Sequence, residues 1–187
     1  MIKNGMGGAN TKTGLVFEGK TDLATFISAQ KDYKIVSQSK NIDSVFYKNE
    51  QVARIFRKYG FYEFLKEYKI EWKNIISQRI LPDDSIFVII KNTIYIIECK
   101  FQNVPGSTDE KLQTCDFKKK QYKKLLAKAN IDVEYMYLLS SWFMQPRYKD
   151  VLDYIHSVGC DYYFEYIPLY KFGLPVPGDQ KNTETEK

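Results

Sequence analysis

The chain has 187 residues, of which 44% are hydrophobic and 27% charged, and its formal net charge is +5. This balance is typical of one soluble globular domain and excludes a chain that is disordered throughout. The longest apolar runs, such as residues 86–90, are too short to cross a bilayer, and residues 1–10 lack the apolar segment of a secretory signal. Three cysteines without a CxxC spacing and a single histidine argue against a zinc site or a disulfide framework, so we expect a cytoplasmic protein without a membrane partner.

The first half of the chain predicts a short glycine-rich arm followed by mixed elements. Hydrophobic spacing favours a helix that starts near Thr13 and carries Phe17, Leu23 and Ile27. Two strand-like runs surround Asn49 and predict a hairpin, and a glycine precedes the next helical pattern. The predicted elements are a flexible arm at 1–14, strands at 44–48 and 52–57, a helix after Gly60 and helical turns within 72–80.

The second half predicts alternating strands and helices. Near-continuous apolar character in two runs separated by Asn92 and Thr93 indicates strands buried on both faces. The predicted elements are strands at 85–91, 94–101, 133–140 and 162–167, helices at 110–128 and 146–158, and a polar tail at 175–187. Because nothing divides the chain, we predict one α/β domain over residues 1–187, with a central mixed sheet flanked by helices.

Charged residues stand at the ends of the two central predicted strands. Asp83 follows Pro82 before the first strand, and Glu98 and Lys100 flank Cys99 in the second. Side chains alternate along a strand, so Glu98 and Lys100 should point one way and Cys99 the other. A turn at residues 92–93 would bring Asp83 beside Glu98, so that two carboxylates and one ammonium converge at one edge of the sheet.

This group of charges suits a hard divalent cation. Carboxylate oxygens without histidine or cysteine ligands favour Mg²⁺ or Mn²⁺, which could activate water against a phosphodiester. Lys100 could orient that water or neutralise the transition state. Glu-x-Lys is also an everyday sequence, and an acidic residue at a strand start is usually a solvated turn group. The position of Glu98 in an apolar run argues for the site, because buried charges are costly unless they are paired or bound to metal.

The arrangement Pro82-Asp83, then Glu98-Cys99-Lys100, resembles the motif of the PD-(D/E)xK nuclease superfamily. The flanking segments 94–102, 106–118 and 7–18 also resemble type II restriction endonucleases, and the resemblance spans roughly residues 5–140. It implies the restriction-endonuclease-like α-β-β-β-α-β core and Mg²⁺-dependent phosphodiester cleavage, in which Mn²⁺ could substitute.

The resemblance also implies roles for individual residues. Asp83 and Glu98 match the metal-binding carboxylates, the Cys99 carbonyl would add a ligand, and Lys100 matches the catalytic lysine. Glu18 matches a glutamate that many members bring near the metal from the first helix. Asp84, directly beside Asp83, leaves open which aspartate faces the ion; Asp83 is favoured because it follows the proline.

The lysine-rich helix is the expected DNA-facing element. Residues 100–130 hold eight lysines against three acidic residues, an excess equal to that of the whole chain. Such a row can neutralise phosphates without reading sequence, although most lysine runs are simply solvated. The candidate DNA contacts are Lys118, Lys119, Lys120 and Lys123 on the helix, with Lys111 and Gln113 at its start.

The function expected from these observations is metal-dependent cleavage of double-stranded DNA by a restriction endonuclease. The nuclease core takes most of the chain and leaves little room for a separate recognition domain. We therefore expect the small strand-cleaving subunit of a heterodimeric type IIS enzyme, with a larger recognition subunit that has its own nuclease site. The alternatives are a stand-alone homodimeric type II enzyme and an inactive DNA-binding or assembly subunit.

Overall fold

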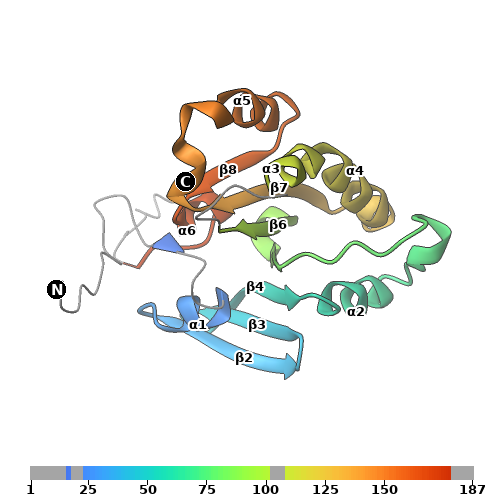
Figure 1. Cartoon of the computed structure of the whole chain (residues 1–187). Coiled ribbons are helices and arrows are strands. Elements are labelled where there is room, and N and C mark those ends of the chain that lie inside the picture. Colours follow the sequence, from blue (N-terminus) through green and yellow to red (C-terminus); the bar gives the residue numbers. More distant parts are fainter. Residues whose placement is uncertain (1–15, 18–22, 102–107, 178–187) are drawn as a thin grey trace, which may run out of the picture.

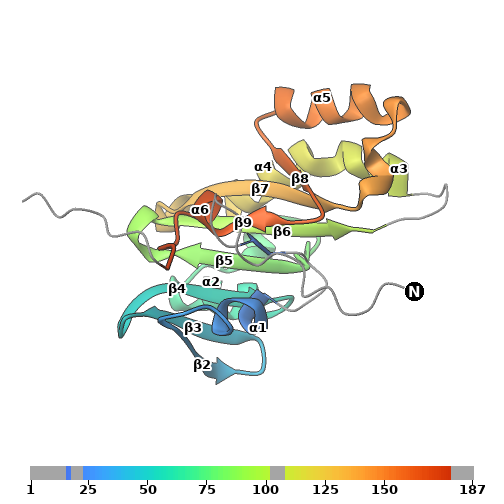
Figure 2. The same cartoon turned by 90° about the vertical axis from the view of Figure 1, so that its left-hand side faces the viewer.

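A computed structural model describes residues 16–17, 23–101 and 108–177 of the chain. Its central element is a seven-stranded sheet in the order β2-β3-β4-β5-β6-β7-β8 (Figures 1 and 2). The strands are β2 (Tyr33–Ser39), β3 (Ile42–Tyr47), β4 (Glu50–Arg57), β5 (Asp84–Val88), β6 (Thr93–Lys100), β7 (Asp132–Leu139) and β8 (Asp161–Phe164). This α/β architecture confirms the predicted fold class.

The sheet is mixed, as predicted. Strands β2 to β6 pair antiparallel, whereas β6, β7 and β8 are parallel neighbours. Parallel neighbours need crossover connections, and helices supply them between β6 and β7 and between β7 and β8. The site described below lies where the antiparallel and parallel halves of the sheet meet, on β5, β6 and β7.

Helices cover both faces of the sheet. The α-helices are α1 (Leu23–Ser28), α2 (Gly60–Glu67), α3 (Thr108–Lys111), α4 (Cys115–Leu126), α5 (Lys149–Ser157) and α6 (Leu169–Phe172). Buried residues of α2, α4 and α5 form one core cluster with one face of the sheet, and those of α1 and α6 form a second cluster with the other face. The domain therefore has three layers, with α1 and α6 on one side of the sheet and α2 and α4 on the other (Figure 1).

Several elements lie where the sequence predicts them, although their first or last residues differ by a few positions. The hairpin β3–β4 turns at Lys48 and Asn49, which both have positive φ, the twist that two-residue hairpin turns favour. The turn before β6 is a short 3-10 segment, Ile89–Lys91, closed by Asn92 in the left-handed region, so Thr93 already belongs to the strand. The lysine-rich helix is divided, because the 3-10 segment Leu112–Thr114 separates α3 from α4.

Three elements differ from the prediction. Val16–Phe17 form a strand, β1, which pairs with β9 (Ile167–Pro168), so the predicted helix from Thr13 is wrong and α1 begins at Leu23. Strand β2 was not expected, because its half-exposed edge carries mostly polar residues and shows no apolar run. The short helix α6 was also not expected. The predicted arm at 1–14 and residues 178–187 of the tail lie outside the described residues.

Among the described helices, none combines the length and the apolar character that crossing a membrane would require.

Candidate active site

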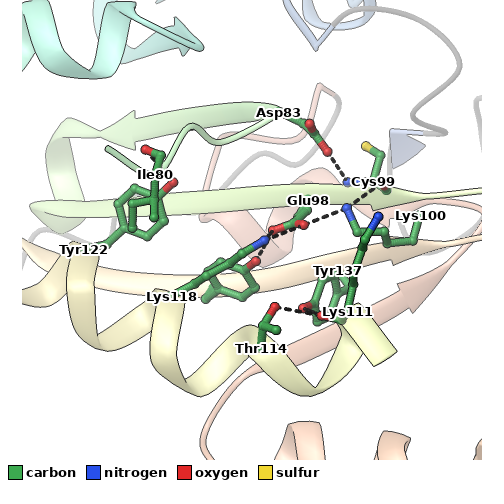
Figure 3. A network of polar contacts seen from close by, with 11 residues as sticks. Ile80, Asp83, Glu98, Cys99, Lys100, Lys111, Thr114, Lys118, Tyr122 and Tyr137 are labelled. Atoms are coloured by element: carbon green, nitrogen blue, oxygen red, sulfur yellow. Dashed lines mark hydrogen bonds and ion pairs between the residues drawn. The ribbon is translucent and has the colours of Figure 1, made fainter. Parts of the chain in front are cut away.

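The pairing of β5 with β6 brings Asp83 to the end of the second strand. Asp84 pairs with Ile97, so the preceding residue, Asp83, lies beside Glu98 and Cys99. The Asp83 carboxylate is exposed and accepts a hydrogen bond from the Cys99 backbone amide at 3.0 Å (Figure 3). The Asp83 carboxylate thus adds one hydrogen bond beyond the last backbone pair of β5 and β6. This contact holds Asp83 at the end of the two strands.

The alternation along β6 separates the charged residues from Cys99. Glu98 follows Ile94 and Ile96 on the face that α4 covers, whereas Cys99 packs with the opposite core cluster. The Lys100 Nζ lies 2.6 Å from Glu98 Oε1, and it also donates to the Cys99 carbonyl at 3.3 Å. The Glu98 and Lys100 side chains have only 12% and 15% of their surface exposed, so this ion pair is largely shielded from water.

Two further residues contact Glu98 that the sequence interpretation did not place there. Lys118, on α4, bonds to both carboxylate oxygens at 2.7 and 2.6 Å (Figure 3). The Tyr135 hydroxyl on β7 donates to Oε2. The sequence predicts Lys118 as a DNA contact and not as a partner of Glu98. A signal existed, because Lys118 lies three residues after Cys115 and four before Tyr122, within the apolar stripe that faces the sheet.

The electrostatic environment keeps Glu98 ionised. Burial alone raises the pKa of Glu98, but the hydrogen bond and charge of Lys100, followed by Lys118 and Tyr135, outweigh burial and hold the pKa below its ordinary value. Burial and the charge of Glu98 raise the pKa of Tyr135, so its hydroxyl stays protonated and remains a donor. The site thus presents a charged carboxylate to two ammonium groups.

The second tyrosine of β7 supports the start of the lysine-rich helix. The rings of Tyr135 and Tyr137 pack edge to face, with centroids 5.5 Å apart. The Tyr137 hydroxyl donates to the Lys111 carbonyl at 3.1 Å, and Thr114 Oγ1 donates to the same carbonyl at 2.7 Å. Figure 3 shows the Lys111 side chain directed toward the end of the site where Lys100 lies.

The donor set fits a hard cation rather than a soft one. Asp83 and Glu98 supply carboxylate oxygens and Cys99 a backbone carbonyl, which are ligand types that Mg²⁺ and Mn²⁺ accept alongside water. Among the described residues, no group of three or more histidine, cysteine, aspartate or glutamate side chains is gathered for a metal. Glu18 and the side chain of Asp84 lie outside the described part of the structure.

The other candidate DNA contacts lie in different surroundings. Lys111, Gln113, Lys120 and Lys123 are exposed. Gln113 lines an open groove of about 650 Å³ together with residues of α5, and Lys120 pairs with Asp116 at 2.8 Å. Lys123 lines a second pocket beside Thr93 and Asp132, at the starts of β6 and β7 and thus at the opposite end of these strands from Glu98.

Lys119 does not belong to an exposed row of lysines. It is 8% exposed, pairs with Glu134 at 2.9 Å and donates to the Gly159 carbonyl. It lies four residues after Cys115 and three before Tyr122, so the turn of the helix directs it inward. Lys119 therefore does not face solvent with the row of lysines in which the sequence places it.

Comparison with known proteins identifies the domain. A family model described as the PD-(D/E)XK nuclease superfamily domain matches residues 30–128, which is more than half of the chain and includes Asp83, Glu98, Lys100 and Lys118. The chain matches none of the curated proteins and none of the solved structures with which it was compared. The matched segment runs from just before β2 to the end of α4 and holds the carboxylates and the lysines that converge there, and on this basis the chain belongs to the PD-(D/E)XK nuclease superfamily.

Proposed function

We propose that the chain is a Mg²⁺-dependent DNA endonuclease, in which Mn²⁺ can substitute. The observation that carries this proposal is the convergence of Asp83, Glu98 and Lys100 at the shared end of β5 and β6, inside a PD-(D/E)XK domain. Two carboxylates and an ammonium in a partly shielded position are the groups that metal-assisted hydrolysis of a phosphodiester requires.

The metal would be held by Asp83, Glu98 and the carbonyl of Cys99, with Glu18 as a further candidate. A bound divalent ion supplies Lewis acidity toward the phosphate and lowers the pKa of water. Lys100 lies 2.6 Å from Glu98 Oε1, where its ammonium can orient the attacking water or stabilise the growing negative charge on the phosphate. Asp83 contributes a carboxylate held in place by the Cys99 amide.

Double-stranded DNA is the proposed substrate and the lysine-rich segment its proposed binding surface. Exposed ammonium groups neutralise backbone phosphates without reading the sequence. Lys111, Gln113 and Lys118 lie on the elements next to the catalytic group, and Lys120 and Lys123 would extend the contact along α4. Lys119 is excluded from this surface by its burial.

The assembly that we propose is a heterodimeric type IIS restriction enzyme in the cytoplasm, with this chain as the small strand-cleaving subunit. One site cuts one strand, so cleavage of both strands needs a second site, which we assign to a larger recognition subunit. A homodimeric type II enzyme is the alternative. An inactive assembly subunit is disfavoured, because a dead site has no reason to keep Asp83, Glu98 and Lys100.

The test is cleavage of a supercoiled plasmid by purified protein with Mg²⁺ or EDTA. Wild type should convert the plasmid to nicked form only with Mg²⁺, and Glu98→Ala should abolish the conversion. Glu67→Ala is the matched control, because Glu67 is an exposed glutamate on α2 that pairs with Arg54. Cleavage that survives Glu98→Ala would refute the site. If wild type alone is inactive, co-purification with a larger nuclease subunit decides between a missing partner and an inactive fold.

A further inference from the structure

Both oxygens of the Glu98 carboxylate already accept hydrogen bonds from neighbouring side chains. Oε1 faces Lys100 and Lys118, and Oε2 faces Lys118 and Tyr135. Three donors on two oxygens leave a metal ion little room to bind the same carboxylate. A cation that takes Glu98 as a ligand must therefore displace one of these donors, and the structure indicates which one can leave.

Lys118 is the donor with the most freedom to move away. Tyr135 is 1% exposed and held between core residues of β7, and Lys100 follows Glu98 by two positions on the same strand. Lys118 reaches Glu98 from α4, and 28% of its side-chain surface is exposed. Its neighbour in sequence, Phe117, is 61% exposed, so this part of the helix borders solvent. A lysine side chain with four rotatable bonds can turn from Glu98 to an anion outside.

We propose that Lys118 is an internal counter-ion that holds Glu98 while metal is absent and moves to a DNA phosphate when the complex forms. The inference rests on the proposed function, since it assumes that Glu98 binds the metal. Lys118 contacts both oxygens of Glu98, so its ammonium and a divalent cation compete for the same carboxylate and repel each other. A DNA phosphate offers Lys118 another anion, and therefore DNA binding frees Glu98 for the metal.

This exchange makes metal binding and DNA binding cooperative. Whatever factor DNA adds to the metal affinity, the metal must add to the DNA affinity, because the coupling between two binding equilibria is reciprocal. The nuclease centre would then be weakly loaded in the free protein and fully loaded on DNA. Such coupling limits metal-dependent chemistry to the moment when the substrate is bound.

The experiment is calorimetric titration with Mn²⁺ of wild type, Lys118→Met and Lys124→Met, each alone and with a short phosphorothioate duplex that resists cleavage. Lys124 is the matched control, because it is an exposed lysine on the same helix. Lys118→Met should bind Mn²⁺ on the order of tenfold more tightly than wild type without DNA. The duplex should raise the Mn²⁺ affinity of wild type and Lys124→Met by a similar factor, and that of Lys118→Met far less.

The outcomes separate this inference from the proposed function. Mn²⁺ binding by Lys118→Met but not by free wild type would support the inference. Equal or weaker Mn²⁺ binding by Lys118→Met, or no binding by either protein, would overturn it. The proposed function fails on a different result, the absence of metal-dependent plasmid cleavage by wild type with its partner. Lys118→Gln repeats the titration with a shorter, neutral polar group, so the conclusion stands even if the methionine variant folds poorly.

Discussion

Replacing Tyr135 with phenylalanine removes one hydroxyl from the centre of the site and leaves the aromatic ring in place. The hydroxyl donates to Glu98 from a residue that is 1% exposed, so no water replaces it easily. Hydrogen bonds to charged groups contribute about 1.5–3 kcal/mol, and we expect Tyr135→Phe to lower the free energy of unfolding by about 2 kcal/mol.

Tyr137→Phe is the matched control for this change. Tyr137 is on the same strand, is fully buried and also loses one hydroxyl, but this hydroxyl donates to a neutral group, the Lys111 carbonyl. That carbonyl keeps its bond from Thr114, so no buried acceptor is left unsatisfied. The expected cost is about 1 kcal/mol, within the range for a bond between neutral groups.

The assay is urea and thermal unfolding of both variants beside wild type. In a domain of this size about 1 kcal/mol lowers the Tm by roughly 2–4 °C, so Tyr135→Phe should lower it by about 4–8 °C and Tyr137→Phe by about half as much. A double-mutant cycle with Glu98→Gln isolates the coupling, which should be at least about 1 kcal/mol. Equal costs for the two tyrosines, or additivity with Glu98→Gln, would refute the argument that the Tyr135 hydroxyl stabilises a buried charge.

Three further predictions follow from other parts of the molecule. Mg²⁺ at a hundred times its Kd should raise the free energy of unfolding of wild type by about 2.7 kcal/mol, and the same concentration should raise that of Asp83→Asn far less. An equal rise in both proteins, measured by calorimetry, would contradict the metal site. Lys120→Gln should lower the slope of log affinity for DNA against log salt concentration by about 0.9, because an exposed ammonium is lost. Lys119→Met should leave this slope unchanged, because Lys119 is buried. Fluorescence anisotropy at several salt concentrations measures both slopes. Gly60→Ala should destabilise the fold by about 1–3 kcal/mol, although alanine usually favours helices, because the added Cβ would lie 2.2 Å from the Asn41 carbonyl oxygen; a higher midpoint in urea would refute this.

The central part of the fold could be predicted from the sequence because its signals are local. Apolar runs, a turn at Asn92 and the helical stripe that includes Tyr122 each reveal an element and its buried face. The alternation along β6 and its pairing with β5 then place Asp83, Glu98 and Lys100 together. Their catalytic and metal-binding roles stay predictions.

The parts that escaped prediction depend on pairing between distant segments. Val16–Phe17 form a strand only because Ile167–Pro168 lie opposite, and no local pattern reports such a partner. The sequence predicts Lys118 and Lys119 as DNA contacts in a lysine-rich row, although their spacing from Cys115 places them beside the buried stripe. A lysine in such a stripe indicates an acidic partner within reach, and here the largely buried Glu98 pairs with Lys118 and the half-exposed Glu134 pairs with Lys119.

The polar network around Glu98 comes from one continuous stretch of the chain, Asp83 to Tyr137, that forms β5, β6, α4 and β7. The cluster on the other face of the sheet includes α1 and α6, from the two ends of the described chain. The polar network and the helices that cover the opposite face thus come from separate segments of the chain. They share only the strands of the sheet. Substitutions on the exposed side of α1 or α6 can therefore change that outer surface while the polar network around Glu98 keeps its geometry. The two surfaces of this domain are free to evolve at different rates.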